Sequence, residues 1–310
     1  MKIGFIGLGT MGGRMAANLR KKGGHELVVN DIRKETAEPH LAAGATWADS
    51  PAQVAEATEL VFTSLPGPPE VRAVALDDNG ILAGLRKGGV YFDLSTNSPT
   101  LIRQLHATFA AQGAHLLDAP VSGGPAGAQS GKLALWVGGD EAIFNQYKQV
   151  LDCIGDQVMY VGPIGAGAIT KLVHNCTGYA IQTAVAEVFA LGVKAGVDPL
   201  ALWKAVRQGA VGRARPYDRY VDQFLVNSYE PPSFALRLAH KDVTLATELG
   251  RELNVPMRVA GIALSDLAEA MNRGWGGRDS KAAMALELER SGVDPIELSL
   301  EELRKILAEG

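Results

Sequence analysis

The chain has few of the features that mark several common protein classes. It has only two cysteines in 310 residues, Cys153 and Cys176, and neither lies in a His/Cys pattern with ligand spacing. No disulfide framework and no metal site are therefore indicated, and we expect both cysteines to be buried, small apolar residues. The 30 basic and 34 acidic residues contain no basic block, which argues against nucleic-acid partners.

Long uncharged apolar runs are also missing. No stretch of about 20 apolar residues escapes a charge, and the opening MKIGFIGLGTMG lacks the order of regions that defines a signal peptide. We therefore expect a cytoplasmic protein without membrane contact. The 47% hydrophobic and 21% charged composition is typical of a soluble globular protein, and the length allows two compact domains.

The first half of the chain alternates short apolar runs with amphipathic stretches. The runs KIGFI, ELVVN, LVFTSL, VYFDLS and HLLDA read as buried strands, with helical patterns between them, and KLALWVGG and QVMYVG extend the series around a helix that begins near Asp140. This alternation predicts a doubly wound parallel sheet covered on both faces. Ser50-Pro51 and Ser98-Pro99 each predict a helix start, an N-cap followed by a first-turn proline.

The pattern changes after Gly162-Pro163. From about Gly165 onward only helical periodicity is found. The predicted fold is α/β, with an N-terminal doubly wound sheet domain over residues 1–163 and an all-helical domain over residues 164–310.

A glycine-rich motif, GLGTMG, follows the first strand directly and opens a helix. Its first glycine permits a tight turn, its second lets the backbone approach a pyrophosphate, and its third allows close helix–strand contact. In this position the motif predicts dinucleotide binding, whereas a glycine turn chosen for packing is the rival interpretation. The residues concerned are Gly7, Leu8, Gly9, Thr10, Met11 and Gly12.

The second strand ends in VVNDIRKE, which places Asn30 and Asp31 where the adenosine ribose of a dinucleotide would lie. A carboxylate there accepts hydrogen bonds from the ribose hydroxyls and repels a 2′-phosphate, so NAD is favoured. NADP is the alternative because the guanidinium of Arg33 could bind that phosphate. An ordinary turn after a strand remains the rival explanation.

Two later strands end in loops that should border the nicotinamide half of the cofactor, since ligands of open parallel sheets lie beyond the carboxyl ends of the strands. SLPGPPEV contributes Leu65 and Pro66, and DLSTNSP contributes Thr96. Helix capping is the competing role for these loops.

The segment DAPVSGGPAGAQSGKL suggests a site for an anion. Its Ser122, Gly123 and Gly124 can direct backbone N–H groups and a hydroxyl toward a substrate carboxylate. A glycine-rich surface hairpin is the alternative.

The run KLVHN places Lys171 and Asn175 one helical turn apart on a largely apolar helix. A buried ammonium is costly, so Lys171 either extends to the surface or lines a polar cleft. In a cleft, Lys171 could exchange a proton with an alcohol while Asn175 orients its oxygen. Such a base needs a pKa below about 10.4, which desolvation or the charge of Lys241 would provide.

Two histidines adjoin these candidate lysines. Adjacent residues on a helix diverge by about 100 degrees, so His174 should not share the face of Lys171 and Asn175, and we interpret His174 and His240 as structural.

Taken in order, GLGTMG, SLPG, DLSTNSP, DAPVSGG, KLVHN and FALRLAHKD resemble the β-hydroxyacid dehydrogenase family over nearly the whole chain. The resemblance implies a Rossmann domain of the 6-phosphogluconate dehydrogenase-like NAD-binding type, then a helical domain that forms homodimers or homotetramers. It implies Lys171 as the acid/base, Asn175 as a substrate-binding residue and Ser122 to Gly124 as the carboxylate site. It also implies that Thr96 and Lys241 contact the cofactor or the edge of the site, with Asp242 fixing Lys241. The common family pattern has an asparagine or similar residue where this chain has His174.

The function this implies is hydride transfer between NAD and a small carboxylate-bearing 3-hydroxy acid of the 3-hydroxyisobutyrate type. An NADPH-dependent reductase of a short aldehyde, such as glyoxylate, succinic semialdehyde or tartronate semialdehyde, is the alternative, and a non-catalytic dinucleotide sensor is an alternative of another class. Arg213, Arg215 and Trp275 are candidates for the far end of the substrate; an exposed, solvated loop is the alternative for the two arginines, and simple packing is the alternative for Trp275.

Overall fold

The computed structural model describes residues 1–213 and 215–309. These form two compact units, the first from Met1 to Thr177 and the second beginning at Gly178. The division falls within one long helix, α9 (Ala166–Lys194). The predicted domain boundary between residues 163 and 164 stays a prediction.

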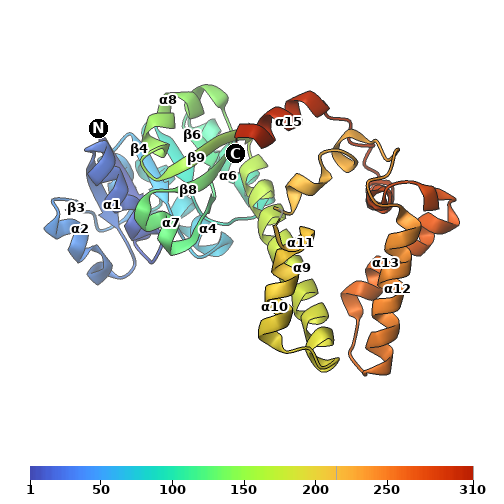
Figure 1. Ribbon diagram of the computed structural model, residues 1–310. Helices are drawn as coiled ribbons and strands as arrows, with labels where there is room; N and C mark the ends of the chain where they lie inside the picture. The colour runs from blue at the N-terminus through green and yellow to red at the C-terminus, as the bar shows by residue number, and fades with distance from the viewer. Residues whose placement is uncertain (214, 310) are drawn as a thin grey trace. The chain divides into compact units, whose positions relative to one another are not determined.

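The first unit is built on one sheet with helices on both of its faces (Figure 1). Its strand order is β3-β2-β1-β4-β5-β6-β8-β7, with β9 pairing on β8, and the strands from β3 to β6 are parallel. This is the order of a dinucleotide-binding sheet, whose strands reverse direction of growth between β1 and β4. The strands are β1 (Lys2–Ile6), β2 (Glu26–Asn30), β3 (Thr46–Trp47), β4 (Leu60–Thr63), β5 (Val90–Asp93), β6 (His115–Asp118), β7 (Val121–Ser122), β8 (Leu133–Gly138) and β9 (Gly155–Gly162).

Every predicted strand is present, but the sheet is not parallel throughout. β8 runs antiparallel to both β6 and β7 and parallel to β9. The reversal has a local cause, since the chain turns back through the short β7 and helix α7 rather than crossing over. β3 and β7 are two residues long, too short for a periodic pattern to reveal.

Three helices of the first unit begin where the sequence predicts and have side-chain caps. Ser50 accepts a hydrogen bond from the Gln53 N–H at 3.2 Å, and Ser98 from the Leu101 N–H at 3.5 Å. Asp140 caps its helix through the Ala142 N–H at 2.8 Å. The helices are α1 (Gly12–Gly23), α2 (Glu38–Ala42), α3 (Pro51–Glu56), α4 (Pro68–Leu76), α5 (Ile81–Gly84), α6 (Pro99–Ala111), α7 (Gly124–Ser130) and α8 (Glu141–Leu151).

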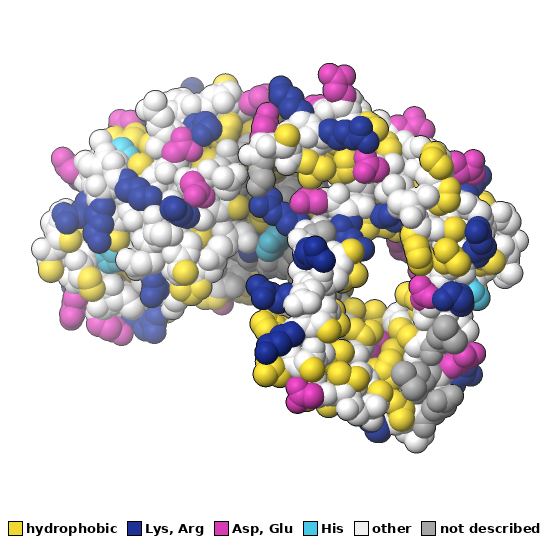
Figure 2. Space-filling model, viewed as in Figure 1, with side chains coloured by type: hydrophobic (Ala, Val, Ile, Leu, Met, Phe, Trp, Pro, Cys, Tyr) yellow, Lys and Arg dark blue, Asp and Glu magenta, His cyan; other side chains and the backbone are white. Residues whose placement is uncertain are grey.

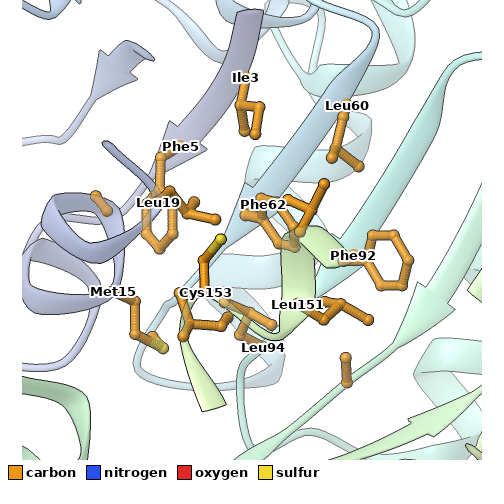
Figure 3. Close-up of a cluster of buried hydrophobic side chains, with 14 of the residues drawn as sticks. Ile3, Phe5, Met15, Leu19, Leu60, Phe62, Phe92, Leu94, Leu151 and Cys153 are labelled. Atoms are coloured by element: carbon orange, nitrogen blue, oxygen red, sulfur yellow. The ribbon is translucent and has the colours of Figure 1, made fainter. Parts of the chain in front are cut away.

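The core lies on both faces of the sheet because each central strand is buried on both sides. On one face Phe5, Phe62 and Phe92 stack across β1, β4 and β5, with centroids 6.1 and 5.5 Å apart (Figure 3). Full burial of each such ring stabilises the fold by about 1.5–3 kcal/mol. Cys153 packs in this cluster, as predicted.

The regular structure of the second unit's described residues is helical, apart from an isolated bridge between Ala235 and Asp279. Asp279 is fully buried, and although burial alone would raise the pKa of its carboxyl, hydrogen bonds from Ser233, Lys281 and Phe234 hold that pKa at about 2. It thereby fixes the chain before α12. Besides the remainder of α9, the helices are α10 (Pro199–Gln208), α11 (Ala210–Arg213), α12 (Leu236–Glu252), α13 (Arg258–Asn272), α14 (Ala285–Arg290) and α15 (Leu300–Glu309).

Helix α9 has an unusual surface. By length and composition it could cross a membrane, with a mean hydropathy of 1.3 over its most apolar window. Much of it is uncovered by other described residues, so the prediction that Cys176 is buried is wrong: its side chain is exposed. The same helix carries Glu187, whose carboxylate accepts the Val259 and Ala260 N–H groups at the start of α13 at 3.0 and 2.9 Å.

Candidate active site

The glycine-rich motif forms a tight turn between β1 and α1. Gly7 has a φ of 92° and would place a Cβ 2.4 Å from the Ser64 carbonyl oxygen, while a Cβ on Gly12 would lie 1.9 Å from the Gly7 oxygen. Only glycine fits either position. Gly9 differs, because a Cβ there meets no atom within 4 Å, so the space beside it is open. This open space in front of the α1 N-terminus is suited to a pyrophosphate; the exposed Thr10 and half-buried Met11 complete the turn.

Asp31 lies against this turn. Its Oδ2 accepts the Leu8 N–H at 2.6 Å and its Oδ1 accepts the Arg33 N–H at 2.8 Å. Asn30 is buried, and its Nδ2 donates to the Ala48 oxygen at 2.9 Å. The predicted ribose-binding carboxylate is therefore held beside the predicted phosphate turn, while Arg33 is exposed on the same loop.

A buried carboxylate joins the two loops after β4 and β5. Asp93 is fully buried and accepts hydrogen bonds from Thr63 Oγ1 at 2.8 Å, Asn97 Nδ2 at 2.8 Å and the Ser95 N–H at 3.1 Å. Ser95 Oγ in turn accepts the Leu65 N–H at 3.0 Å.

These contacts link the predicted nicotinamide-side residues Leu65, Pro66 and Thr96, of which Pro66 and Thr96 are exposed. Burial raises the pKa of the Asp93 carboxyl, and the hydrogen bonds from Ser95, Asn97 and Thr63 oppose that rise.

A second buried carboxylate, Asp118 at the end of β6, fixes the start of α9. Its two oxygens accept the Gly165 N–H at 2.8 Å and the Ala168 N–H at 2.6 Å. Gly167 lets this turn lie directly on the sheet, because a Cβ there would be 2.3 Å from the Trp136 oxygen. The first turn of α9 is thus anchored to the strand ends.

Lys171 follows one helical turn after Ala168. Its side chain is buried, at 9% exposure, and burial lowers the pKa of its ammonium. The structure thus supplies one of the two causes proposed from the sequence, desolvation. A lysine with a lowered pKa on a helix at the edge of a dinucleotide-binding sheet is suited to proton transfer.

Three elements bring the predicted substrate residues together near Lys171. Ser122 lies on β7, which pairs with β8, and its Oγ is 3.5 Å from His174 Nε2. His174 Nδ1 is 3.1 Å from Asn175 Oδ1, and the His174 ring is tilted on that of Trp136 at a centroid distance of 5.1 Å. Gly123 and Gly124, both with positive φ, lead from Ser122 into α7.

The prediction that His174 turns away from this face is wrong. Although its Cα is offset from that of Asn175, the ring reaches the carboxamide and the β7 hydroxyl. Side-chain length here outweighs the divergence of adjacent helical positions.

The remaining predicted residues belong to the second unit. Lys241 Nζ donates to Asp242 Oδ1, which confirms that pair, and both side chains are more than half exposed. Its predicted contact with the cofactor stays a prediction. Arg213 donates from Nε to the Gln208 oxygen at 2.5 Å, Trp275 is flanked by the guanidinium groups of Arg273 and Arg278, His240 is half-buried and Arg215 is exposed.

The sequence did not indicate the contacts of three residues: Asp93, Asp118 and His174. Each of the two aspartates ends a strand and lies within a motif that the sequence analysis had identified. Their positions could be read from the sequence, but their hydrogen-bond partners could not. The partners of Asp118 lie 47 and 50 residues further along the chain.

Comparison with known proteins agrees with this geometry. Residues 2–162 match a family described as the NAD binding domain of 6-phosphogluconate dehydrogenase, and residues 165–287 match one described as NAD-binding of NADP-dependent 3-hydroxyisobutyrate dehydrogenase. The chain is 34% identical to 2-(hydroxymethyl)glutarate dehydrogenase of Eubacterium barkeri, over 94% of this chain and 97% of that protein.

Two further proteins are similar. The chain is 36% identical to a 3-hydroxyisobutyrate dehydrogenase of Pseudomonas aeruginosa, over 79% of this chain and 83% of that one. A solved structure of Mycobacterium tuberculosis 3-hydroxyisobutyrate dehydrogenase with L-serine has a TM-score of 0.64 and 29% identity, covering 92% of this chain and 98% of that one.

The sheet, the glycine turn and the matches define an NAD(P)-dependent oxidoreductase that acts on CH–OH groups. Within that class, the chain belongs to the β-hydroxyacid dehydrogenase family. The open space at Gly9 and the adjacent Asp31 carboxylate fit the cofactor of this family.

Proposed function

We propose that this enzyme is an NAD-preferring dehydrogenase that interconverts a small 3-hydroxy acid and its semialdehyde or keto acid. The observation that carries the proposal is a buried lysine, Lys171, one helical turn before Asn175, on a helix whose His174 contacts both Asn175 and Ser122 at the end of a dinucleotide-binding sheet. The two relatives named for 3-hydroxyisobutyrate and 2-(hydroxymethyl)glutarate support it, because both names describe acids with a hydroxyl group on the carbon β to a carboxylate.

Each residue then has a defined part. A nicotinamide cofactor, when bound, would supply the hydride transfer. Lys171, as a neutral amine, takes the hydroxyl proton as the substrate is oxidised, and its ammonium returns a proton in the reverse direction. Burial favours the neutral amine, so the same desolvation that lowers its pKa prepares the base. Asn175 orients the reacting oxygen, and Ser122 with the Gly123 and Gly124 N–H groups binds the carboxylate.

The preference for NAD follows from Asp31. A carboxylate fixed beside the phosphate turn accepts ribose hydroxyls and repels a 2′-phosphate. Arg33 is exposed on the same loop and supports the alternative, reduction of a short aldehyde with NADPH at the same site. A non-catalytic dinucleotide sensor is disfavoured by the buried Lys171.

We also infer that the helical unit binds the substrate's far end and forms a homodimer or homotetramer. Apolar side chains lie exposed along α9 and α10, in the region where Figure 2 shows hydrophobic atoms gathered. This helix carries two charged residues: Lys171 is buried, and Glu187 accepts backbone hydrogen bonds from α13. Such a helix is suited to a protein partner rather than to lipid. We place the enzyme in the cytoplasm. The most exposed of these side chains are Val173, Tyr179, Val185, Val188, Leu200, Trp203 and Val206.

The test is the initial rate of NADH or NADPH formation across a panel of small 3-hydroxy acids, followed by the reverse reaction with short aldehydes. Turnover of a 3-hydroxy acid with NAD supports the proposal. Turnover only of aldehydes with NADPH favours the alternative, and binding of NADH without any turnover favours the sensor. Light scattering of the same sample gives the oligomeric state, and a monomer at all concentrations would contradict the assembly.

A further inference from the structure

His174 lies between the two residues that the proposed function assigns to the substrate. Its ring stands on α9, faces Ser122 on β7 and packs on Trp136 of β8, so that three elements fix one side chain. The imidazole is exposed, while Ser122 and Asn175 are half-buried. Its ring is therefore accessible to a ligand.

The hydrogen bonds define what each atom of this group offers. A carboxamide oxygen only accepts, so the 3.1 Å contact to Asn175 Oδ1 requires a proton on His174 Nδ1. The contact occupies Oδ1 and leaves Nδ2, the donor end of the carboxamide, turned away from the imidazole. His174 thus selects the orientation in which Asn175 offers N–H groups to a substrate oxygen.

The other ring nitrogen faces the predicted carboxylate site. His174 Nε2 lies 3.5 Å from Ser122 Oγ, a hydroxyl that would donate to a bound carboxylate. A carboxylate seated on Ser122 therefore comes within reach of Nε2, which donates to a carboxylate oxygen when that nitrogen carries a proton. Packing on Trp136, with ring planes 48° apart, holds the ring in this position.

We propose that His174 is a specificity-determining residue: with Ser122 it binds the substrate's carboxylate, and through Asn175 it orients the carboxamide that holds the reacting oxygen. The inference rests on the proposed function.

The experiment is calorimetric titration of the enzyme–NADH complex with isobutyrate, and with isobutyramide as its neutral counterpart. Two variants are compared with wild type: His174→Phe, which keeps a ring against Trp136 but removes both hydrogen bonds, and His174→Ala. Cys176→Ala, exposed on the same helix, is the control. Wild type should bind isobutyrate about tenfold more tightly than isobutyramide, and both His174 variants should lose most of that ratio.

For a hydroxy acid that is turned over, KM should rise in both variants while KM for NAD stays unchanged. A residue that only supports the fold would lower Tm and leave the acid-to-amide ratio alone. The proposal is overturned if wild type shows no preference for the acid, or if either folded variant keeps the wild-type ratio. If no 3-hydroxy acid is turned over, the proposed function fails, yet the calorimetry still decides the role of His174 because it needs no turnover.

Discussion

Asp118 Oδ2 accepts the backbone N–H of Ala168 at 2.6 Å, one helical turn before Lys171, the proposed acid/base. Four residues after Asp118 comes Ser122, the first residue of the predicted carboxylate site. One carboxylate at the end of β6 therefore sets the position of the helix that carries Lys171 relative to the predicted substrate loop.

Asp118→Asn should impair both stability and turnover. The asparagine side chain would place its N–H₂ group against one of the two backbone N–H donors, which lowers the free energy of unfolding by about 1–3 kcal/mol. A shifted α9 displaces Lys171, so kcat should fall by about ten- to a hundredfold, while the Kd of NADH stays within a small factor. Thermal melting, steady-state rates and NADH fluorescence titration measure these effects.

The matched control is Asp140→Ala, which removes the cap of α8, at a cost of about 1 kcal/mol. It should lower Tm and leave kcat unchanged. Equal losses of kcat in the two variants would show that Asp118 has no specific effect on the catalytic helix.

The glycine turn offers a pair of substitutions with opposite outcomes. Gly12→Ala should unfold or strongly destabilise the protein, since its Cβ would lie 1.9 Å from the Gly7 oxygen. Gly9→Ala should fold with a wild-type Tm, because its Cβ meets no protein atom, yet bind NADH at least about tenfold more weakly because the methyl group enters the phosphate space. Melting curves and fluorescence titration separate the two. Undiminished NADH binding by Gly9→Ala would place the pyrophosphate elsewhere.

Asp31 should control the choice of cofactor. Asp31→Asn keeps an oxygen for the Leu8 N–H but removes the charge, so the ratio of kcat/KM with NAD to that with NADP should fall at least about tenfold. Adding Arg33→Ala should reverse part of any gain with NADP. An unchanged ratio in Asp31→Asn would show that Asp31 does not select the cofactor.

Lys171→Met should stabilise the fold while abolishing turnover, since burial of the ammonium is unfavourable. We expect a gain of order 1 kcal/mol near neutral pH. The pKa of Lys171 in the folded protein lies below its ordinary value. At pH values between these two pKa values the unfolded chain binds more protons than the folded one, so the stability of the wild type rises with pH. The gain over wild type should therefore shrink as pH rises toward about 10. Urea unfolding at several pH values gives the comparison; a gain that grows with pH would contradict the direction of the shift.

Much of the first unit was predictable because its signals are local. Ser98-Pro99 marks a helix start within two residues, and the steric need for glycine at positions 7 and 12 follows from one motif. The parts that could not be predicted depend on distant partners or on surroundings. Asp118 accepts hydrogen bonds from residues that follow β8 and β9 in the chain. Cys176 is exposed because α9 is largely uncovered, and the apolar sequence of α9 does not reveal this.

The site was predicted less completely than the fold. The KLVHN motif indicated Lys171 and Asn175. Helical geometry placed His174 on another face, because it describes the directions of the Cα positions and not how far an imidazole side chain extends. Residues of the second unit, Lys241 among them, were named from the resemblance, and their contacts with substrate and cofactor remain predictions.

The most direct measurement is a single-turnover experiment with Lys171→Ala. Enzyme in excess is mixed with the best 3-hydroxy acid and saturating NAD, and NADH formation is followed from pH 6 to 10. The account predicts a loss of about 10²- to 10⁴-fold in rate, with NADH binding retained and the rise of the wild-type rate with pH abolished. A rate equal to wild type, with the same pH profile, would contradict the assignment of Lys171 as the proton acceptor.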